Sequence, residues 1–274
     1  MNAFQDLAAG RAGRLLEAAL ETARDEYPDL DVRCYLRKFD SLVQGFDLYL
    51  AVHGVAQADP AAVLEALQRY FFTELGFAPA GENYYDPRNS YVNEVLDRRT
   101  GIPITLSVIF RALAASAGVE LCGVNLPGHF VLAFPARLGP RTYVDVYNGG
   151  VRLDWAECCR RARGVLEDGA PLVENDFPPM PERDILVRML RNLKGIYAQT
   201  DHPRALRIQE RLIQLLPGAP AELRDLALLY ACNNKPILAH RTFEQLVRQH
   251  PTMGETDFIQ ERARHAAREA ALVN

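Results

Sequence analysis

The sequence has no excess of basic residues, which sets it apart from proteins that bind nucleic acid through charge. Its 274 residues contain 31 Lys and Arg against 35 Asp and Glu, a formal net charge of −4. Proteins that read DNA or RNA need a concentrated basic face. The sequence therefore predicts no direct nucleic-acid partner, and we expect its two arginine clusters to be solvated helix faces: Arg160, Arg161 and Arg163, and Arg262, Arg264 and Arg268.

Long hydrophobic runs are equally scarce. No apolar stretch approaches the roughly 20 residues that a helix needs to cross a bilayer. Asp6 interrupts the beginning of the chain, where a signal peptide would carry an unbroken apolar segment. We therefore expect neither a membrane segment nor a secretion signal, and we place the protein in the cytoplasm.

Cysteine offers neither a disulfide framework nor a zinc motif. The five cysteines are scattered and odd in number, which favours the reduced thiols of a cytoplasmic protein. There is no Cys-x-x-Cys pair and no histidine at ligand spacing from a cysteine. The sequence predicts no metal and no cofactor. A metal held by Glu94, His129 and Asp145 is the least favoured alternative.

Amphipathic helices are present before residue 80. Apolar residues recur at helical spacing over 15–23 and again over 32–50. The pair Asp59-Pro60 has the form of an N-cap followed by a first-turn proline, so a third helix is predicted to begin there. Residues 78–86 are expected to be a loop.

The chain is organised around an apolar stretch between residues 89 and 150. A helix capped by Asn89 or Ser90 leads to the turn at Thr100–Pro103, where we expect Gly101 to supply a free φ. The following helix is apolar on almost every face, and such a helix is buried. Gly118 ends it.

Three predicted strands follow the buried helix and bring two polar side chains together. Their β-branched and aromatic composition marks Val119–Leu126, Phe130–Phe134 and Tyr143–Tyr147 as strands. Because His129 and Asp145 belong to successive strands, we expect them to lie side by side and to be hydrogen-bonded or nearly so. A carboxylate beside an imidazole is the arrangement that orients a catalytic histidine.

Three motifs in this stretch resemble a known family. The sequences NEVLDRRTGIPITLS, GVNLPGHFVL and VDVYNGG are similar to the bacterial SirB invasion regulators, which join a transglutaminase-like domain to tetratricopeptide repeats. The resemblance implies a cleft with His129 and Asp145 as tentative catalytic residues. It also implies a cysteine nucleophile about fifteen residues before Gly118, and that position is Pro103.

The family motifs also supply candidate binding residues. Asn93, Glu94 and Arg98 lie on the helix before the glycine turn, where a structural role is favoured and Glu94 can pair with Arg98. Thr105 and Ser107 are the possible substitute nucleophiles near the start of the buried helix, although such hydroxyls usually bond to the carbonyl one turn earlier. Cys122 lies on a predicted strand within reach of this region, where the role of a small buried apolar residue is favoured. The binding set is completed by Asn125, Tyr147 and Asn148.

The end of the chain repeats itself after a proline-rich connection. Ala205 and Ala239 are separated by 239 − 205 = 34 residues, and Leu212 and Leu246 by 246 − 212 = 34. A period near 34 resembles tetratricopeptide units. We therefore predict a core over 1–170, a connection over 171–181 and a repeat region over 182–274, with a last helix over 255–272.

The predicted fold is α+β: N-terminal helices and a small antiparallel sheet on a buried helix, followed by an all-α repeat unit. Without a cysteine at position 103 the acyl-enzyme route has no first step. The favoured function is therefore a non-catalytic module that binds a protein or peptide, with a possible regulatory role implied by the family. The alternative is a hydrolase or amide-transferring enzyme that uses His129 and Asp145. The sequence does not specify an oligomeric state.

Overall fold

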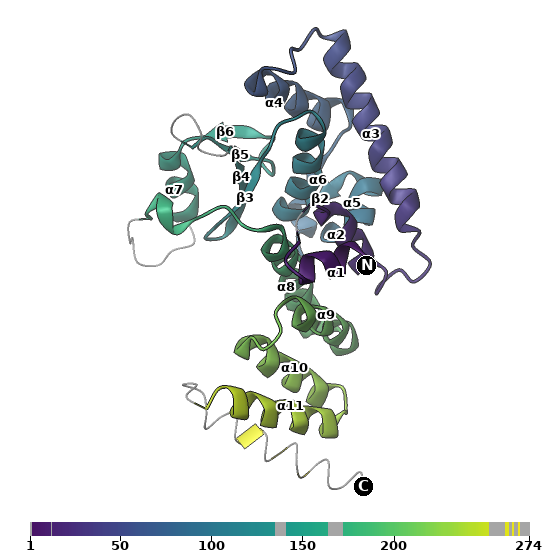
Figure 1. Cartoon of the computed structure of the whole chain (residues 1–274), viewed down its shortest axis with the longest axis vertical. Coiled ribbons are helices and arrows are strands. Elements are labelled where there is room, and N and C mark those ends of the chain that lie inside the picture. Colours follow the sequence, from purple (N-terminus) through teal and green to yellow (C-terminus); the bar gives the residue numbers. More distant parts are fainter. Residues whose placement is uncertain are drawn as a thin grey trace. The chain divides into compact units, whose positions relative to one another are not determined.

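The computed structural model describes residues 2–11, 13–134, 141–163 and 172–251, together with 261–262, 265 and 268 (Figure 1). The chain divides into two compact units, Met1–Leu7 with Ala12–Leu186 and Ala8–Arg11 with Val187–Asn274. The division falls inside α8 (Glu182–Thr200). The expected helix over 255–272 lies mostly outside the described residues.

The first unit begins with helices that bury their apolar stripes. They are α1 (Ala3–Ala8), α2 (Leu15–Ala23), α3 (Val32–Val52), α4 (Pro60–Arg69), α5 (Val92–Arg98) and α6 (Pro103–Ser116). The predicted cap of α4 is confirmed, because the Asp59 carboxylate accepts the N–H groups of Ala61 and Ala62 at 2.9 and 3.3 Å. A π-helical turn, Tyr70–Glu74, follows α4. The short α1 was not expected from the sequence.

The turn between α5 and α6 differs from the prediction in two ways. The left-handed residue is Arg99, with φ 58°, whereas Gly101 has no positive φ. Gly101 is needed for space instead, because a Cβ there would meet Val95 Cγ1 at 3.0 Å. Gly101 also belongs to β2 (Thr100–Gly101), which pairs in parallel with β1 (Ala78–Pro79), so the predicted loop over 78–86 begins with a strand.

The predicted cap of α5 was also wrong. The N-cap residue of α5 is Tyr91, and it has no side-chain cap. Asn89 instead ends a short 3₁₀ turn over Pro87–Asn89. Its Nδ2 donates to the Asn83 carbonyl at 2.7 Å and its Oδ1 accepts from Arg98 at the end of α5, so its side chain does not cap the first turn of the helix.

A four-stranded antiparallel meander forms the centre of the first unit. Its order is β3 (Cys122–Leu126), β4 (His129–Ala133), β5 (Tyr143–Asp145) and β6 (Val151–Leu153), followed by α7 (Trp155–Arg163). Pro127 and Gly128, with φ 68° at the glycine, make the tight turn that pairs Leu126 with His129. The sequence predicted the first three strands, but β6 was missed.

The two faces of this sheet carry different helices (Figure 1). Val131 and Ala133 of β4 and Tyr143 of β5 share a core cluster with Cys158 of α7, and Trp155 packs against it. No residue of α6 belongs to that cluster, yet α6 packs against β4. Because strand side chains alternate between faces, α6 covers the face that presents Phe130 and Leu132.

The second unit is helical and shows the predicted period. Its helices are the second part of α8, α9 (His202–Leu215), α10 (Pro220–Cys232) and α11 (Pro236–Gln249). The repeated positions are equivalent in structure, because Ala205 and Leu212 of α9 and Ala239 and Leu246 of α11 are all fully buried. The α+β class is therefore confirmed, with an all-α repeat region. Within the described ranges, no helix is both long and apolar enough to span a membrane.

Candidate functional site

His129 and Asp145 meet where β4 begins and β5 ends. The sequence prediction of their proximity is confirmed, since His129 Nε2 lies 2.8 Å from Asp145 Oδ2. Asp145 is fully buried and the His129 side chain is 15% exposed. The two atoms are in direct contact, although Nε2 does not meet the geometry of a well-aligned hydrogen bond.

The turn after β5 holds the same carboxylate. Asn148 donates its backbone N–H to Asp145 Oδ1 at 3.1 Å and its Nδ2 to Oδ2 at 2.8 Å. The backbone N–H of Gly150 donates to the Asp145 carbonyl at 2.8 Å. Asn148, predicted as a binding residue, therefore acts within this structure as a fixed partner of Asp145.

A third partner of Asp145 was not predicted. Arg161 of α7 donates from Nη1 to Asp145 Oδ2 and from Nε to Glu157 Oε1, the latter at 3.1 Å. The expectation that this arginine belongs to a solvated helix face was wrong, whereas Arg160 is 63% exposed. The signal available in the sequence was the position of Asp145 between two valines in a predicted strand. Such an aspartate is expected to be buried, and a buried charge requires a partner.

These contacts determine the ionisation of the site. Burial alone would raise the pKa of Asp145, but the contacts with His129 and Asn148 outweigh it and lower that pKa below its ordinary value of 3.8. Burial tends to lower the pKa of Arg161, yet its bonds to Glu157 and Asp145 raise it. The cluster therefore holds a carboxylate and a guanidinium in their charged forms at neutral pH.

The substitute nucleophiles do not face this pair. Thr105 and Ser107 are fully buried on α6, and their hydroxyl oxygens have no partner within the described part of the chain. The expected bond from Thr105 to the carbonyl one turn earlier is missing. His129 and Asp145 alternate onto the sheet face that α7 covers, whereas α6 packs on the other face.

The remaining predicted binding residues form separate groups. On α5, Asn93 is buried with an unpartnered Oδ1. Arg98 donates to Asn89 Oδ1 at 3.2 Å and not to Glu94, with which it was expected to pair. Tyr147 packs on Tyr84 at 6.3 Å between ring centroids. Asn125 is exposed on β3.

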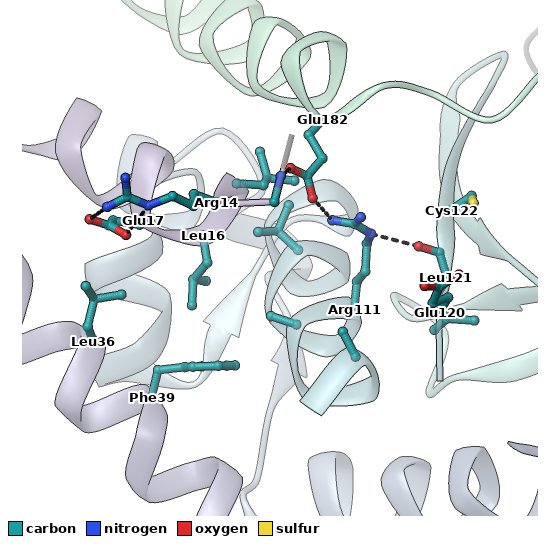
Figure 2. A pocket seen from close by; sticks show the side chains of 15 residues that line it. Arg14, Leu16, Glu17, Leu36, Phe39, Arg111, Glu120, Leu121, Cys122 and Glu182 are labelled. Carbon is teal, nitrogen blue, oxygen red and sulfur yellow. Dashed lines mark hydrogen bonds and ion pairs between the residues drawn. The ribbon is translucent and has the colours of Figure 1, made fainter. Parts of the chain in front are cut away.

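A pocket of about 630 Å³ lies on the first unit, away from the histidine and aspartate (Figure 2). Its apolar wall includes Leu36 and Phe39 of α3, and Arg111 of α6 crosses it. Arg111 donates from Nε to the Leu121 carbonyl at 2.7 Å and from Nη1 to Glu182 at 2.8 Å. Arg111 thereby connects β3 to the start of α8. This pocket was not predicted from the sequence.

The described residues contain no group of three His, Cys, Asp or Glu side chains placed to hold a metal ion. The metal alternative, with Glu94 as a third ligand, therefore has no geometric support there.

Comparison with known proteins gives two family matches and several relatives. Residues 33–191 match the transglutaminase-like superfamily and residues 193–271 match tetratricopeptide repeats. A UPF0162 protein of Xylella fastidiosa (strain Temecula1) is 43% identical over 220 residues, which cover 79% of this chain and 76% of that protein. A UPF0162 protein of Vibrio cholerae is 28% identical over 222 residues, 80% of each chain. Human F-box only protein 21 is 35% identical over 103 residues, which cover 35% of this chain and 16% of that protein.

Proposed function

We propose that this chain is a non-catalytic module which binds a protein or peptide. The premise is that it belongs to the transglutaminase-like superfamily and to the UPF0162 family of bacterial proteins. Its transglutaminase-like unit keeps a histidine and an aspartate in contact, but the position where the family resemblance places the cysteine nucleophile is Pro103. The tetratricopeptide region offers a second surface for protein contacts.

The observation that carries this proposal is Pro103 at the first position of α6. A proline has no side chain that can attack a carbonyl, and it lacks the N–H that could stabilise an oxyanion there. Two of the three parts of an acyl-transfer site are lost together. The hydroxyls of Thr105 and Ser107 do not replace them, because they are buried on the far side of the sheet from His129.

The partners of Asp145 support a structural role for the pair. In a working triad the carboxylate is committed to the histidine. Here the same Oδ2 atom also accepts from Arg161 and Asn148. The carboxylate thus stabilises the junction of β5, its turn and α7. The resemblance to SirB proteins adds a regulatory role, exerted through protein contacts rather than through DNA.

A hydrolase that uses His129 and Asp145 is the second candidate, and one observation favours it. His129 contacts the carboxylate of Asp145 and its side chain is 15% exposed, so its ring is placed to accept a proton from water. General base action of this kind contributes about 10²–10⁴-fold in rate when no nucleophile is positioned.

The two candidates are separated by covalent labelling. The full chain would be incubated with thiol- and hydroxyl-directed acylating probes, and adducts would be mapped by mass spectrometry. We expect no adduct that depends on His129. A stoichiometric adduct on Thr105, Ser107 or Cys122 that disappears in His129→Ala would overturn the non-catalytic proposal. His129→Gln, which keeps a polar side chain of similar reach, serves as the control for loss of folding.

A further inference from the structure

Strand β3 is an edge strand of the four-stranded sheet, and a segment of the same chain crosses it. In the described sheet β3 has a strand neighbour on one side only, β4. The N–H of Met180 donates to the Gly123 carbonyl at 2.8 Å, which makes an isolated antiparallel bridge. Residues Val173–Met180, here named the strap, lead directly to α8.

The strap is held by side chains as well as by this bridge. Tyr143 donates its hydroxyl to Glu174 Oε1 at 2.6 Å, and Arg141 donates to the Phe177 carbonyl at 3.2 Å. The Phe177 ring packs on Trp155 with 5.8 Å between centroids. Glu174–Asp176 forms a 3₁₀ turn, so the strap is extended only toward Met180. The strap binds through the carboxylate of Glu174, the ring of Phe177 three positions later and the backbone N–H of Met180 three positions after that.

The register of the bridge leaves one outward-facing carbonyl of β3 without a donor from the strap. In an antiparallel pair the backbone groups of alternate residues point to the same side, so Asn125 faces the edge as Gly123 does. Extending the pairing of Gly123 with Met180 by two residues places Pro178 opposite Asn125. Proline has no N–H to donate. The Asn125 carbonyl therefore cannot be paired by the strap.

The other end of the strap is anchored. Glu182, the first residue of α8, forms an ion pair with Arg111 at 2.8 Å and also accepts the N–H of Gly13 (Figure 2). Ile185 packs so closely on Gly123 that a Cβ there would meet its Cδ1 at 2.9 Å. Residues 173–180 can therefore lift from β3 while α8 keeps its own contacts.

We propose that the strap is an internal ligand that occupies a peptide-binding site at the β3 edge, and that a partner peptide with a similar turn followed by an extended end displaces it. This inference rests on the proposed function and names the site and the chemistry of its ligand. The partner segment has an acidic residue and an aromatic residue at the spacing of Glu174 and Phe177, and a residue with an N–H at the position of Met180. At the position of Pro178 it has a residue with an N–H.

The energetics allow such an exchange. Prolines at a sheet edge prevent unwanted strand pairing, which explains why the strap covers β3 weakly. A tethered segment acts at an effective concentration on the order of millimolar, so a free peptide must bind better than the strap does. The extra hydrogen bond to Asn125, worth about 1 kcal/mol, gives such a peptide roughly a fivefold advantage in affinity.

The first test uses two labelled peptides with the sequence of residues 172–181. One carries Pro178→Thr, whose new N–H faces Asn125, and the other carries Pro179→Thr, whose N–H faces away from β3. Binding to the full chain is measured by fluorescence anisotropy. The Pro178→Thr peptide is expected to bind about fivefold more tightly than the Pro179→Thr peptide. Amide hydrogen exchange over residues 121–126 of the chain is expected to slow when the Pro178→Thr peptide binds.

The second test changes the chain itself. Met180→Pro removes the N–H that pairs with Gly123, whereas Met180→Leu keeps it. The Pro178→Thr peptide is expected to bind the Met180→Pro chain about fivefold more tightly than it binds the wild-type chain. Its affinity for the Met180→Leu chain is expected to equal its affinity for the wild-type chain. Pro178→Thr in the chain strengthens the strap and is expected to weaken binding of the same peptide, while Pro179→Thr leaves it unchanged.

Three results would overturn the proposal. They are equal affinity of the two peptides, no binding of either peptide to Met180→Pro, and a dimer in Met180→Pro whose chains exchange straps, which would assign the edge to a second copy. These results are independent of covalent labelling. An adduct that depends on His129 would remove the non-catalytic proposal even if the peptide binds, and equal peptide affinities would remove the strap proposal alone.

Discussion

In the part of each unit that the structure describes, one carboxylate is buried among cationic and amide partners, and the two carboxylates are held differently. Asp145 lies in the first unit against His129, Asn148 and Arg161. Glu222 of α10 is 2% exposed in the second unit. It accepts from Arg191 and Lys194 of α8 and from Gln209 of α9, as shown by bonds of 2.6, 3.0 and 2.9 Å.

The two carboxylates differ in which elements supply their partners. The partners of Glu222 come from two other helices, so this carboxylate joins α8, α9 and α10 of the second unit. The partners of Asp145 lie within sixteen residues of it, on β4, on its own turn and on α7. For both acids burial would raise the pKa, and the hydrogen bonds lower it. A buried acid with charged and amide partners is therefore no evidence of catalysis by itself, since a purely helical unit also contains one.

The largest effect is expected for Glu222→Ala. This change leaves Lys194, which is 15% exposed, and Arg191 without their central partner. Removing one member of a buried ionic network costs about 3 kcal/mol, and Lys194 retains Asp225 at 2.7 Å. Urea unfolding of the full chain measures the loss. The exposed Glu210 on α9 supplies the control, because Glu210→Ala is expected to leave the midpoint unchanged.

A smaller loss is expected for Asp145→Ala, about 2 kcal/mol. In this variant Arg161 keeps its bond to Glu157, and its side chain is 29% exposed. Water therefore hydrates the guanidinium in part and offsets some of the loss of its Asp145 partner. Thermal unfolding measures the change, with Asp40→Ala on an exposed position of α3 as the control. Equal losses in Asp145→Ala and Glu222→Ala would mean that the number of helices joined does not determine the cost.

The contribution of Asp145 also depends on pH. Its pKa is lowered in the folded protein, so the unfolded chain binds more protons than the folded one as pH falls past the ordinary value of 3.8. The stabilisation is therefore complete above that value and is lost as pH falls through the folded pKa. The gap in stability between wild type and Asp145→Ala is expected to close in acid. A gap that stays constant down to pH 2 would contradict the lowered pKa.

The smallest of these effects is expected for Arg161→Met, about 1 kcal/mol. Methionine keeps much of the apolar stem of arginine but removes the bonds to Asp145 and Glu157. Chemical denaturation compares it with Arg160→Met, one residue away and 63% exposed, where no change is expected. A similar loss in both variants would mean that Arg161 contributes through helix α7 rather than through Asp145.

Sequence reasoning succeeded where the relevant contacts are close along the chain. The contact of His129 with Asp145 follows from the order of two strands, and the 34-residue period places Ala205 and Ala239 at equivalent buried positions. The α+β class follows from the same patterns of composition and periodicity.

Sequence reasoning failed where tertiary packing determines which residues are in contact. Arg161 resembles its exposed neighbour Arg160 in sequence, and only the docking of α7 on the sheet distinguishes the two. The parallel pair of β1 and β2 has two residues in each strand, too few to show any periodicity. The strap was recognised as a proline-rich connection, but its register on Gly123 depends on the position of the β3 edge.

The meander of β3 to β6 has a consequence for how the protein folds. Every strand in it pairs with its neighbour along the chain, so its contacts close short loops. Folding is faster when contacts are local, since less loop entropy is lost before they form. We expect the sheet that holds His129 and Asp145 to assemble in the folding transition state, before the long-range pairing of β1 with β2. Pulse-labelling hydrogen exchange would reveal this order through earlier protection of Val131 and Val144 than of Ala78.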